Sequence, residues 1–473
     1  MFSLVALKCT TILCMSLCAG GIFLFPLLAP GLIEHLHLTQ PQLSTIALAG
    51  MAGQYPFSFV VGWLFDRYGP QLCSFLAAVM FSAAFGLSAS ELSSTPGHSE
   101  RPGAAVAWRL TIYFAMAGLG TVLSYFAFVF SATKTFTRYL TIASGVTMAL
   151  FGLSPLFLSY IASKFFSDSS TGVLNISQFL QFLAMSTGVV NLAGAFTLVI
   201  PSSATTSSTS NSSATNNDAN EQSPLINRET APDCMQDPRD NSTLEFLRDP
   251  YFWILAFYMV MILGACEMII SNVGTIVISL PSQFIQTLTS EGEQVASLQV
   301  KILSVSNTLS RLLVGPVADF VSPVFSYQHP EGFTTVTKHR MSRMVFLSGS
   351  ASLLAITCAW MVFGVQTRHD VWLLSVGTGI TYGAVWTVLP GVTCSVWGIR
   401  NLARNFGLIA YSPFVGTPIF SYVYALIVAR HTLQGMTCKG RICWESTFIF
   451  SLGTSLAALA ITAILWRKWS GRM

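Results

Sequence analysis

The chain has 473 residues, of which 52% are hydrophobic and only 9% are charged. An average soluble domain contains roughly 25% charged residues, which help to cover its surface. The composition therefore excludes a soluble enzyme, a disordered protein and a nucleic-acid-binding protein. The net charge of +4 at pH 7 does not indicate a polyanionic partner.

Twelve apolar runs are long enough to cross a membrane as helices. A spanning helix needs about 20 mostly apolar residues, and these runs are continuous rather than alternating as in barrel strands. The first six runs lie at about 6–30, 43–65, 71–91, 108–132, 139–162 and 178–200. The second six lie at about 251–280, 295–320, 343–364, 370–397, 404–429 and 446–466. The sequence thus predicts an all-α integral membrane protein with one six-helix bundle in residues 1–200 and another in residues 250–473.

The distribution of basic residues predicts the orientation of these helices. If the N-terminus is cytoplasmic, the basic residues on the cytoplasmic side are Lys8, Arg67, Lys134, Arg138, Arg228, Arg239, Arg248, Lys338, Arg340, Arg343, Arg400, Arg404, Arg467, Lys468 and Arg472. The opposite side then holds Arg101, Arg109, Lys164, Arg368, Arg430, Lys439 and Arg441. Because cytoplasmic loops are enriched in Lys and Arg, we expect both termini in the cytoplasm.

A polar segment separates the two bundles. Residues 201–249 are rich in Ser, Thr and Asn and show no apolar periodicity, so we expect a disordered cytoplasmic linker. The glycosylation sequons at Asn211 and Asn241 lie inside it and should stay unmodified. A third sequon, at Asn175, falls in an outer loop close to the sixth helix, where modification stays an open alternative.

The second helix of each bundle ends in the same short pattern, G-x-x-x-D. The first copy, in GWLFDRYGP, contains Gly62, Asp66, Arg67 and Gly69, and the second, in GPVADF, contains Gly315 and Asp319. A small residue lets a neighbouring helix approach closely, and an acid at an interface can bind a base or a helix N-terminus. Parallel repeats of six helices are typical of one transporter architecture. We expect these residues to favour one conformation of the protein over another.

At these residues the chain resembles the major facilitator superfamily. Four further segments, AGGIFLFPLLAPGLIEHLHLTQPQLSTIA, SNTLSRLLVGPVADF, WGIRNLARNFG and CKGRICWESTF, are similar to the fungal monocarboxylate-transporter-homologue group, which is related to plant nodulin-like carriers. The resemblance covers nearly the whole chain. It implies a proton-coupled carrier in the vacuolar membrane that works by alternating access. The expected partners are a small-molecule solute, protons and membrane lipid, with no nucleic acid, and we expect a monomer.

Ionisable residues inside a membrane are candidates for function, because holding them there is energetically costly. Glu267, Lys301 and Arg311 stand out in this way. A polar stripe with helical spacing contains Lys301, Ser304, Thr308, Arg311 and Gly315. We expect this stripe to face a central cavity, with Lys301 near the outer end reaching water.

Arg311 is the predicted anion-binding residue. A guanidinium keeps its charge and presents a planar fork of donors that suits a carboxylate. The other predicted solute-binding residues are Asn307, Ser304 and Asn272. At Asn307 the monocarboxylate permeases are expected to have an acid, so the sequence departs from the chemistry of lactate or pyruvate transport.

Glu267 is the predicted proton-coupling residue. If the solute competes with Glu267 for Arg311, the acid takes up a proton and couples the two movements. The alternative is a fixed Glu267–Arg311 ion pair that holds two helices together. The flanking Gly264 and Gly274 suggest a bendable helix that lines the cavity. Aromatic candidates for the same cavity are Tyr125, Tyr382 and Trp386. The alternative is that they only pack between helices, as most aromatic residues in such spans do.

Cys438 and Cys443 lie together in the last outer loop. A disulfide is expected if that side is oxidising, and the resemblance favours it. Zinc is the alternative, but no third and fourth ligands are nearby.

A sorting signal is predicted in the linker. Glu221 precedes the pair Leu225 and Ile226 by four residues, as in an acidic dileucine motif that binds a sorting adaptor. Together with the resemblance, this motif favours a vacuolar or lysosome-like membrane over the plasma membrane.

The sequence shows no phosphate-binding loop, no zinc-binding HExxH and no catalytic triad, so we expect neither an enzyme nor a bound cofactor or metal. The predicted function is secondary transport of a small carboxylate-like solute. The alternatives are a membrane nutrient sensor that keeps the carrier fold, a plasma-membrane carrier and a channel.

Overall fold

The structure is a computed structural model of the chain. It describes residues 2–25, 27–28, 32, 36, 38, 40–94, 104–166, 174–198, 243–281, 290–322, 328–329, 332–333, 342–431 and 438–469. The polar linker up to residue 242, including Asn211, Asn241 and the sorting motif Glu221, Leu225 and Ile226, lies outside the described residues.

The described residues of the first half of the chain form a bundle of seven α-helices and two short 3-10 turns. Its elements are α1 (Phe2–Cys18), η1 (Ala19–Leu24), α3 (Gln40–Gln54), α4 (Ser58–Tyr68), α5 (Pro70–Ser94), α6 (Ala104–Thr135), η2 (Thr137–Tyr139), α7 (Leu140–Phe165) and α8 (Ile176–Thr197). Helix α5 packs against α6 and α8, and α3 packs against α6.

The second half forms a matching bundle. Its elements are α9 (Thr243–Arg248), α10 (Pro250–Ser279), α11 (Ser290–Val321), α12 (Met344–Phe363), η3 (Arg368–Val371), α13 (Trp372–Trp397), α14 (Leu402–Ile409), α15 (Tyr411–His431), η4 (Arg441–Cys443) and α16 (Glu445–Trp469). Between α11 and α12, the two-residue strands β1 (Gln328–His329) and β2 (Gly332–Phe333) pair antiparallel. Helix α11 packs against α13, α10 against α15, and α12 against α16.

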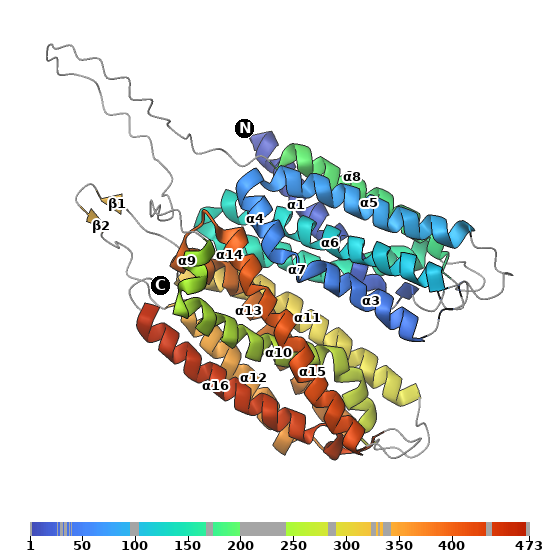
Figure 1. The fold of residues 1–473 in the computed structure, drawn as a ribbon. Coiled ribbons are helices and arrows are strands. Elements are labelled where there is room, and N and C mark those ends of the chain that lie inside the picture. The colour runs from blue at the N-terminus through green and yellow to red at the C-terminus, as the bar shows by residue number, and fades with distance from the viewer. Residues whose placement is uncertain are drawn as a thin grey trace, which may run out of the picture.

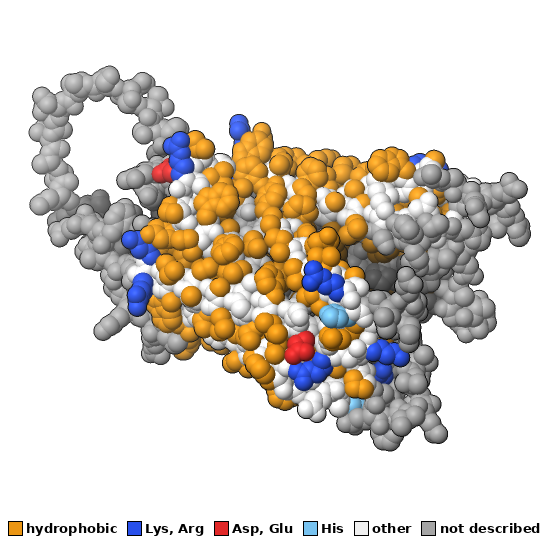
Figure 2. Space-filling view, turned by 60° about the horizontal axis from the view of Figure 1, so that its bottom comes forward, with side chains coloured by type: hydrophobic (Ala, Val, Ile, Leu, Met, Phe, Trp, Pro, Cys, Tyr) orange, Lys and Arg blue, Asp and Glu red, His pale blue; other side chains and the backbone are white. Residues whose placement is uncertain are grey.

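Ten helices of the described chain are long and apolar enough to cross a membrane. The other two predicted spans are the α3–α4 pair, which is broken in the middle, and α11, whose polar stripe lowers its hydropathy. Hydrophobic side chains cover most of the face seen in Figure 2, with Lys and Arg gathered toward its two ends. This pattern suits a bundle surrounded by lipid, and the predicted all-α membrane fold is confirmed.

Two predicted helices are broken, and the linker ends in a helix. The predicted span 43–65 is interrupted at Tyr55–Phe57, because Pro56 removes a backbone N–H and disfavours helical geometry in the residue before it. The predicted span 404–429 bends between α14 and α15, at Ala410. The last part of the predicted linker forms α9. Its Phe246 is buried, and the centroid of the Phe246 ring lies 5.0 Å from that of Trp397.

The two bundles meet at one end of the molecule and separate toward the other (Figure 1). We call the end where the bundles meet the linker end. Helix α1 starts there, α8 ends there, and α9 and the end of α16 lie there. The other end is the disulfide end, where Cys438 and Cys443 lie. Helix α4 packs against α14, and α7 packs against α11 and α13, so these five helices join the bundles.

Four glycines allow the close approach at the linker end. A Cβ on Gly62 would stand 2.4 Å from the carbonyl oxygen of Ala403, and one on Gly407 would stand 2.4 Å from that of Ser58. The second pair of helices repeats this arrangement. A Cβ on Gly145 would stand 2.6 Å from the carbonyl oxygen of Arg311, and one on Gly315 would stand 2.8 Å from that of Thr141. Backbone therefore lies directly on backbone between the bundles.

Candidate functional site

Glu267 lies in the middle of α10, where hydroxyl groups from three other elements surround its carboxylate. The Tyr55 and Tyr382 hydroxyls donate to Oε1, each at 3.2 Å, and the Thr417 hydroxyl donates to Oε2. Tyr55 belongs to the α3–α4 break in the first bundle, whereas Tyr382 and Thr417 come from α13 and α15 of the second. The carboxylate is thus bonded across the interface between the bundles.

Arg311 lies on α11 with only 7% of its surface exposed. Its Nε donates to the Asn307 side-chain oxygen at 3.0 Å, and its Nη1 donates to the backbone carbonyl of Met148 at 3.1 Å. Among the described residues, no group accepts a hydrogen bond from Nη2, and no carboxylate forms an ion pair with this guanidinium. Arg311 and Glu267 are both described, so the predicted alternative of a fixed pair between them is absent from this conformation.

Tyr382 connects these two charged residues. Its hydroxyl donates to Glu267, and the guanidinium carbon of Arg311 lies 5.8 Å from the centre of its ring, within the range of a cation–π contact. Tyr125 on α6 lies within electrostatic range of Arg311, and its ring packs 5.2 Å from Phe151. The structure therefore brings Glu267, Arg311, Asn307, Tyr382 and Tyr125 into one central region.

The helix faces beside this region become uncovered toward the disulfide end. On α11, Gly315 is buried against Thr141, whereas Ser304, three turns away on the same face, is exposed. On α7, Gly145 contacts Arg311, but Leu156, three turns away on the same face, is 63% exposed. Both α7 and α11 are therefore in contact with the opposite bundle near the linker end and lose that contact toward the disulfide end.

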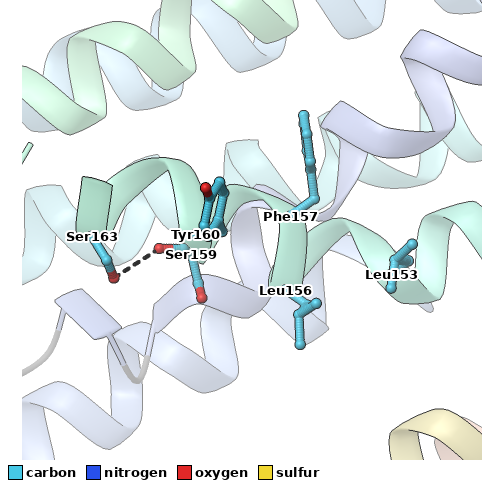
Figure 3. Close-up of a pocket in the computed structure, with 6 residues that line it drawn as sticks. All are labelled: Leu153, Leu156, Phe157, Ser159, Tyr160 and Ser163. Carbon is cyan, nitrogen blue, oxygen red and sulfur yellow. Dashed lines mark hydrogen bonds between the residues drawn. The ribbon is translucent and has the colours of Figure 1, made fainter. Parts of the chain in front are cut away.

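A shallow apolar groove of about 520 Å³ runs along this part of α7 (Figure 3). Its lining residues are Leu153, Leu156, Phe157, Ser159, Tyr160 and Ser163. All six come from one helix, so the groove is a consequence of the uncovered face of α7 and not an enclosed binding site.

Aromatic side chains close the central region toward the linker end. The ring centroid of Phe406, on α14, lies 5.2 Å from that of Phe130 and 6.0 Å from that of Phe126, both on α6. It lies 5.9 Å from the ring centroid of Trp386 on α13. All four side chains are buried. They join the two bundles by apolar contacts between the predicted site and the helix-end motifs.

In the first copy of the G-x-x-x-D motif, Asp66 binds the opposite bundle. Its Oδ2 accepts from the backbone N–H of Arg404 at 2.7 Å, at the start of α14, and its Oδ1 accepts from Lys134 at 2.7 Å. We expected Arg67 to make a contact that favours one conformation, but its side chain is exposed. Its guanidinium carbon lies 5.3 Å from the ring centroid of Trp63 and 5.6 Å from that of Tyr68. Arg67 follows Asp66 directly on a helix, so it cannot point in the same direction.

The second copy has the same arrangement. Asp319 accepts from the backbone N–H of Ile142 at 2.8 Å, near the start of α7 in the other bundle. It also forms an ion pair with Arg343 at 3.1 Å, and Arg343 is almost completely buried. Lys134 and Arg343 were predicted only as cytoplasmic basic residues. Their pairing with the motif acids has no local sequence signal, since they lie 68 and 24 residues away along the chain.

The remaining predicted site residues are separate from the central cluster. Asn272 donates to the Met268 carbonyl of its own helix at 2.8 Å, and the described chain shows no contact between its side chain and Arg311. Ser304 and Lys301 are exposed toward the disulfide end. Gly69 ends α4 with a φ of 84°, which a residue with a Cβ rarely adopts. Cys438 and Cys443 form a disulfide, with their Cα atoms 5.9 Å apart.

Comparison with known proteins identifies the family. Residues 11–330 match the model of the Major Facilitator Superfamily, which is more than half of the chain. The chain belongs to this superfamily. It is therefore an integral multi-pass membrane transporter and not an enzyme.

Similar sequences come from fungi. A Gibberella zeae protein named "Probable transporter MCH1" is 28% identical over 97% of this chain and 88% of its own length. Its Saccharomyces cerevisiae namesake is 25% identical over 96% of this chain and 90% of its own length. The resemblance to the fungal monocarboxylate-transporter-homologue group is thus confirmed.

Solved structures share the fold at low sequence identity. The transporter FucP in its outward conformation matches with a TM-score of 0.58 at 12% identity, over 96% of this chain and 98% of that one. A bacterial homologue of the iron transporter ferroportin in its outward-facing state matches with a TM-score of 0.61 at 12% identity, over 98% and 100% of the two chains.

Proposed function

We propose that this transporter moves a small carboxylate-bearing solute together with a proton across the vacuolar membrane, by alternating access. The observation that supports the proposal most is the buried Arg311 guanidinium, which has no acidic partner within the described chain. A buried cation without a counter-charge is costly, and a solute anion would offset that cost. Asn307 and the Met148 carbonyl hold the guanidinium in place, so that Nη2 is left for the solute.

The proposed orientation places the linker end in the cytoplasm. The excess of Lys and Arg in the loops expected at that end supports this orientation. The disulfide then faces the vacuolar lumen, where disulfides persist more readily than in the cytoplasm. In this conformation the carrier is closed toward the cytoplasm by the glycine contacts and the aromatic side chains. The alternate state requires the bundles to part at the linker end.

Glu267 is the proposed proton carrier. Its ionised form accepts three donated hydrogen bonds, and one of them, from Tyr55, comes from the other bundle. A protonated carboxyl has less acceptor capacity, so proton uptake weakens this link between the bundles. Protonation therefore favours separation of the helices that Glu267 joins in the present state.

Glu267→Gln is expected to separate solute movement from the proton gradient. Glutamine keeps the shape of the side chain but cannot carry the proton. In reconstituted vesicles, accumulation driven by a pH gradient should fall at least tenfold, while exchange of labelled for unlabelled solute continues. The matched control is Glu245→Gln, on the exposed surface of α9. Gradient-driven accumulation by the Glu267→Gln protein would contradict the proposal.

The vacuolar destination is tested by the linker motif. Replacing Leu225 and Ile226 together by alanine removes the apolar pair that an adaptor would bind. A fluorescently tagged variant is expected to move from the vacuolar membrane to the plasma membrane. Asn227→Ala serves as the control next to the motif. An unchanged distribution of the double variant would show that this motif does not direct sorting.

A further inference from the structure

Tyr382 has a position in the site that the proposed roles of Arg311 and Glu267 do not explain. Its hydroxyl is 3.2 Å from Oε1 of Glu267, and its ring faces the guanidinium of Arg311 at 5.8 Å. The ring is held by helix α13 and packs 6.2 Å from the Trp386 ring. One rigid side chain thus contacts both the proposed anion site and the proposed proton carrier.

We propose that Tyr382 is a positioning residue that couples solute binding at Arg311 to proton uptake at Glu267. This inference rests on the proposed function, since it assigns a coupling element to that same site. The coupling is physical: the orientation of one phenol ring determines both the cation–π contact at its face and the hydrogen bond at its hydroxyl.

The empty site favours the arrangement seen in the structure. The unpaired guanidinium attracts the electron-rich face of Tyr382, and this contact helps to keep the hydroxyl directed at Glu267. Three donated hydrogen bonds then favour the ionised carboxylate over its protonated form. In the empty carrier these bonds therefore act against proton uptake by Glu267.

Binding of a carboxylate changes both contacts. The solute's negative charge offsets the charge of the guanidinium and draws it toward the new partner, which weakens its attraction to the Tyr382 ring. The hydroxyl of Tyr382 then no longer stays fixed on Oε1, and the ionised form of Glu267 loses one of its donors. Glu267 takes its proton from the solvent on the open side, and no other covalent bond changes. A singly charged carboxylate then moves with one proton without net charge, whereas a solute with more negative charges would carry the remainder across the membrane.

Tyr55 provides a matched comparison for Tyr382. Both phenols donate to the same carboxylate oxygen at the same distance of 3.2 Å. Only Tyr382 makes a ring contact with Arg311 within the described structure, whereas Tyr55 packs 6.1 Å from Phe414 of the opposite bundle. The other groups that face Glu267 do not add a charge: α15 contributes Thr417, and Cys266 adjoins it on α10.

The test compares Tyr382→Phe with Tyr55→Phe in the full-length protein reconstituted into vesicles. The probe is whichever of acetate, lactate, succinate and citrate the wild-type protein takes up fastest. For Tyr382→Phe we expect exchange of labelled for unlabelled probe to stay within threefold of wild type, which also shows that the variant folds. Accumulation driven by a pH gradient should fall at least tenfold. Tyr55→Phe, which removes another donor to Glu267 but no contact with Arg311, should lower the ratio of protons to solute less than Tyr382→Phe does.

Tyr382→Leu, which also removes the ring, should in addition raise the KM for the probe about tenfold. Equal proton-to-solute ratios in Tyr382→Phe and Tyr55→Phe would overturn the inference, as would loss of both exchange and accumulation in Tyr382→Phe, because a merely structural role predicts these results. Failure of the proposed function is distinguishable: the wild-type protein would then take up none of the four probes, and the inference would fall with it.

Discussion

Replacing Arg311 by glutamine is expected to lower the uptake of a carboxylate solute at least a hundredfold. A hydrogen bond to a charged group contributes about 1.5–3 kcal/mol. A carboxylate bound by two such bonds therefore gains about 3 kcal/mol or more, which corresponds to roughly a hundredfold in affinity. Uptake of labelled solute by reconstituted vesicles measures the effect.

Arg311→Lys distinguishes recognition by shape from recognition by charge. Lysine keeps the positive charge but lacks the planar fork, and it cannot bind Asn307 and Met148 while also presenting a second donor pair. We expect it to recover only a small part of the lost uptake. The control is Arg430→Gln, an exposed arginine at the end of α15. If Arg311→Gln leaves carboxylate uptake unchanged in folded protein, the guanidinium does not bind the solute.

The second large effect is expected for Gly62→Ala. One added Cβ would stand 2.4 Å from the carbonyl oxygen of Ala403 and 2.7 Å from its carbonyl carbon, both backbone atoms that have little room to move. The linker end can then close only if α4 and α14 move apart. That movement also separates Asp66 from the backbone N–H of Arg404, which it binds at 2.7 Å. We expect transport to fall more than tenfold, because the closed state is lost from the cycle.

Hydrogen exchange over α14 measures that opening directly. The backbone amide of Arg404 should lose protection in Gly62→Ala, since its acceptor on α4 is withdrawn. Gly453→Ala on α16 is the matched control, because a Cβ there would meet no atom within 4 Å of the described structure. Wild-type exchange and wild-type transport in Gly62→Ala would show that the contact is not required for closure.

Local sequence patterns predicted the positions of most helices but not the places where two of them change direction. Apolar runs predicted the spans to within a few residues for most helices; for example, the run 251–280 corresponds to α10 at Pro250–Ser279. They did not predict the interruption at Tyr55–Phe57 or the bend before α15, because hydropathy averaged over a span hides a local change of backbone direction. The interruption matters for function, since it brings Tyr55 to Glu267.

Sequence patterns alone predicted the membrane fold, the duplicated halves, the motif acids Asp66 and Asp319, and the two intramembrane charges Glu267 and Arg311. Each of these depends on the solvent preference of a residue or on spacing along one helix, and both are local properties. The contacts of those residues, in contrast, become visible only in the folded protein. Glu267 receives hydrogen bonds from positions 115 to 212 residues away, Arg311 faces Tyr382 and not Glu267, and Arg67 turns to the surface while Arg343 is buried. These contacts depend on how the helices pack and rotate against one another, which no single helix encodes.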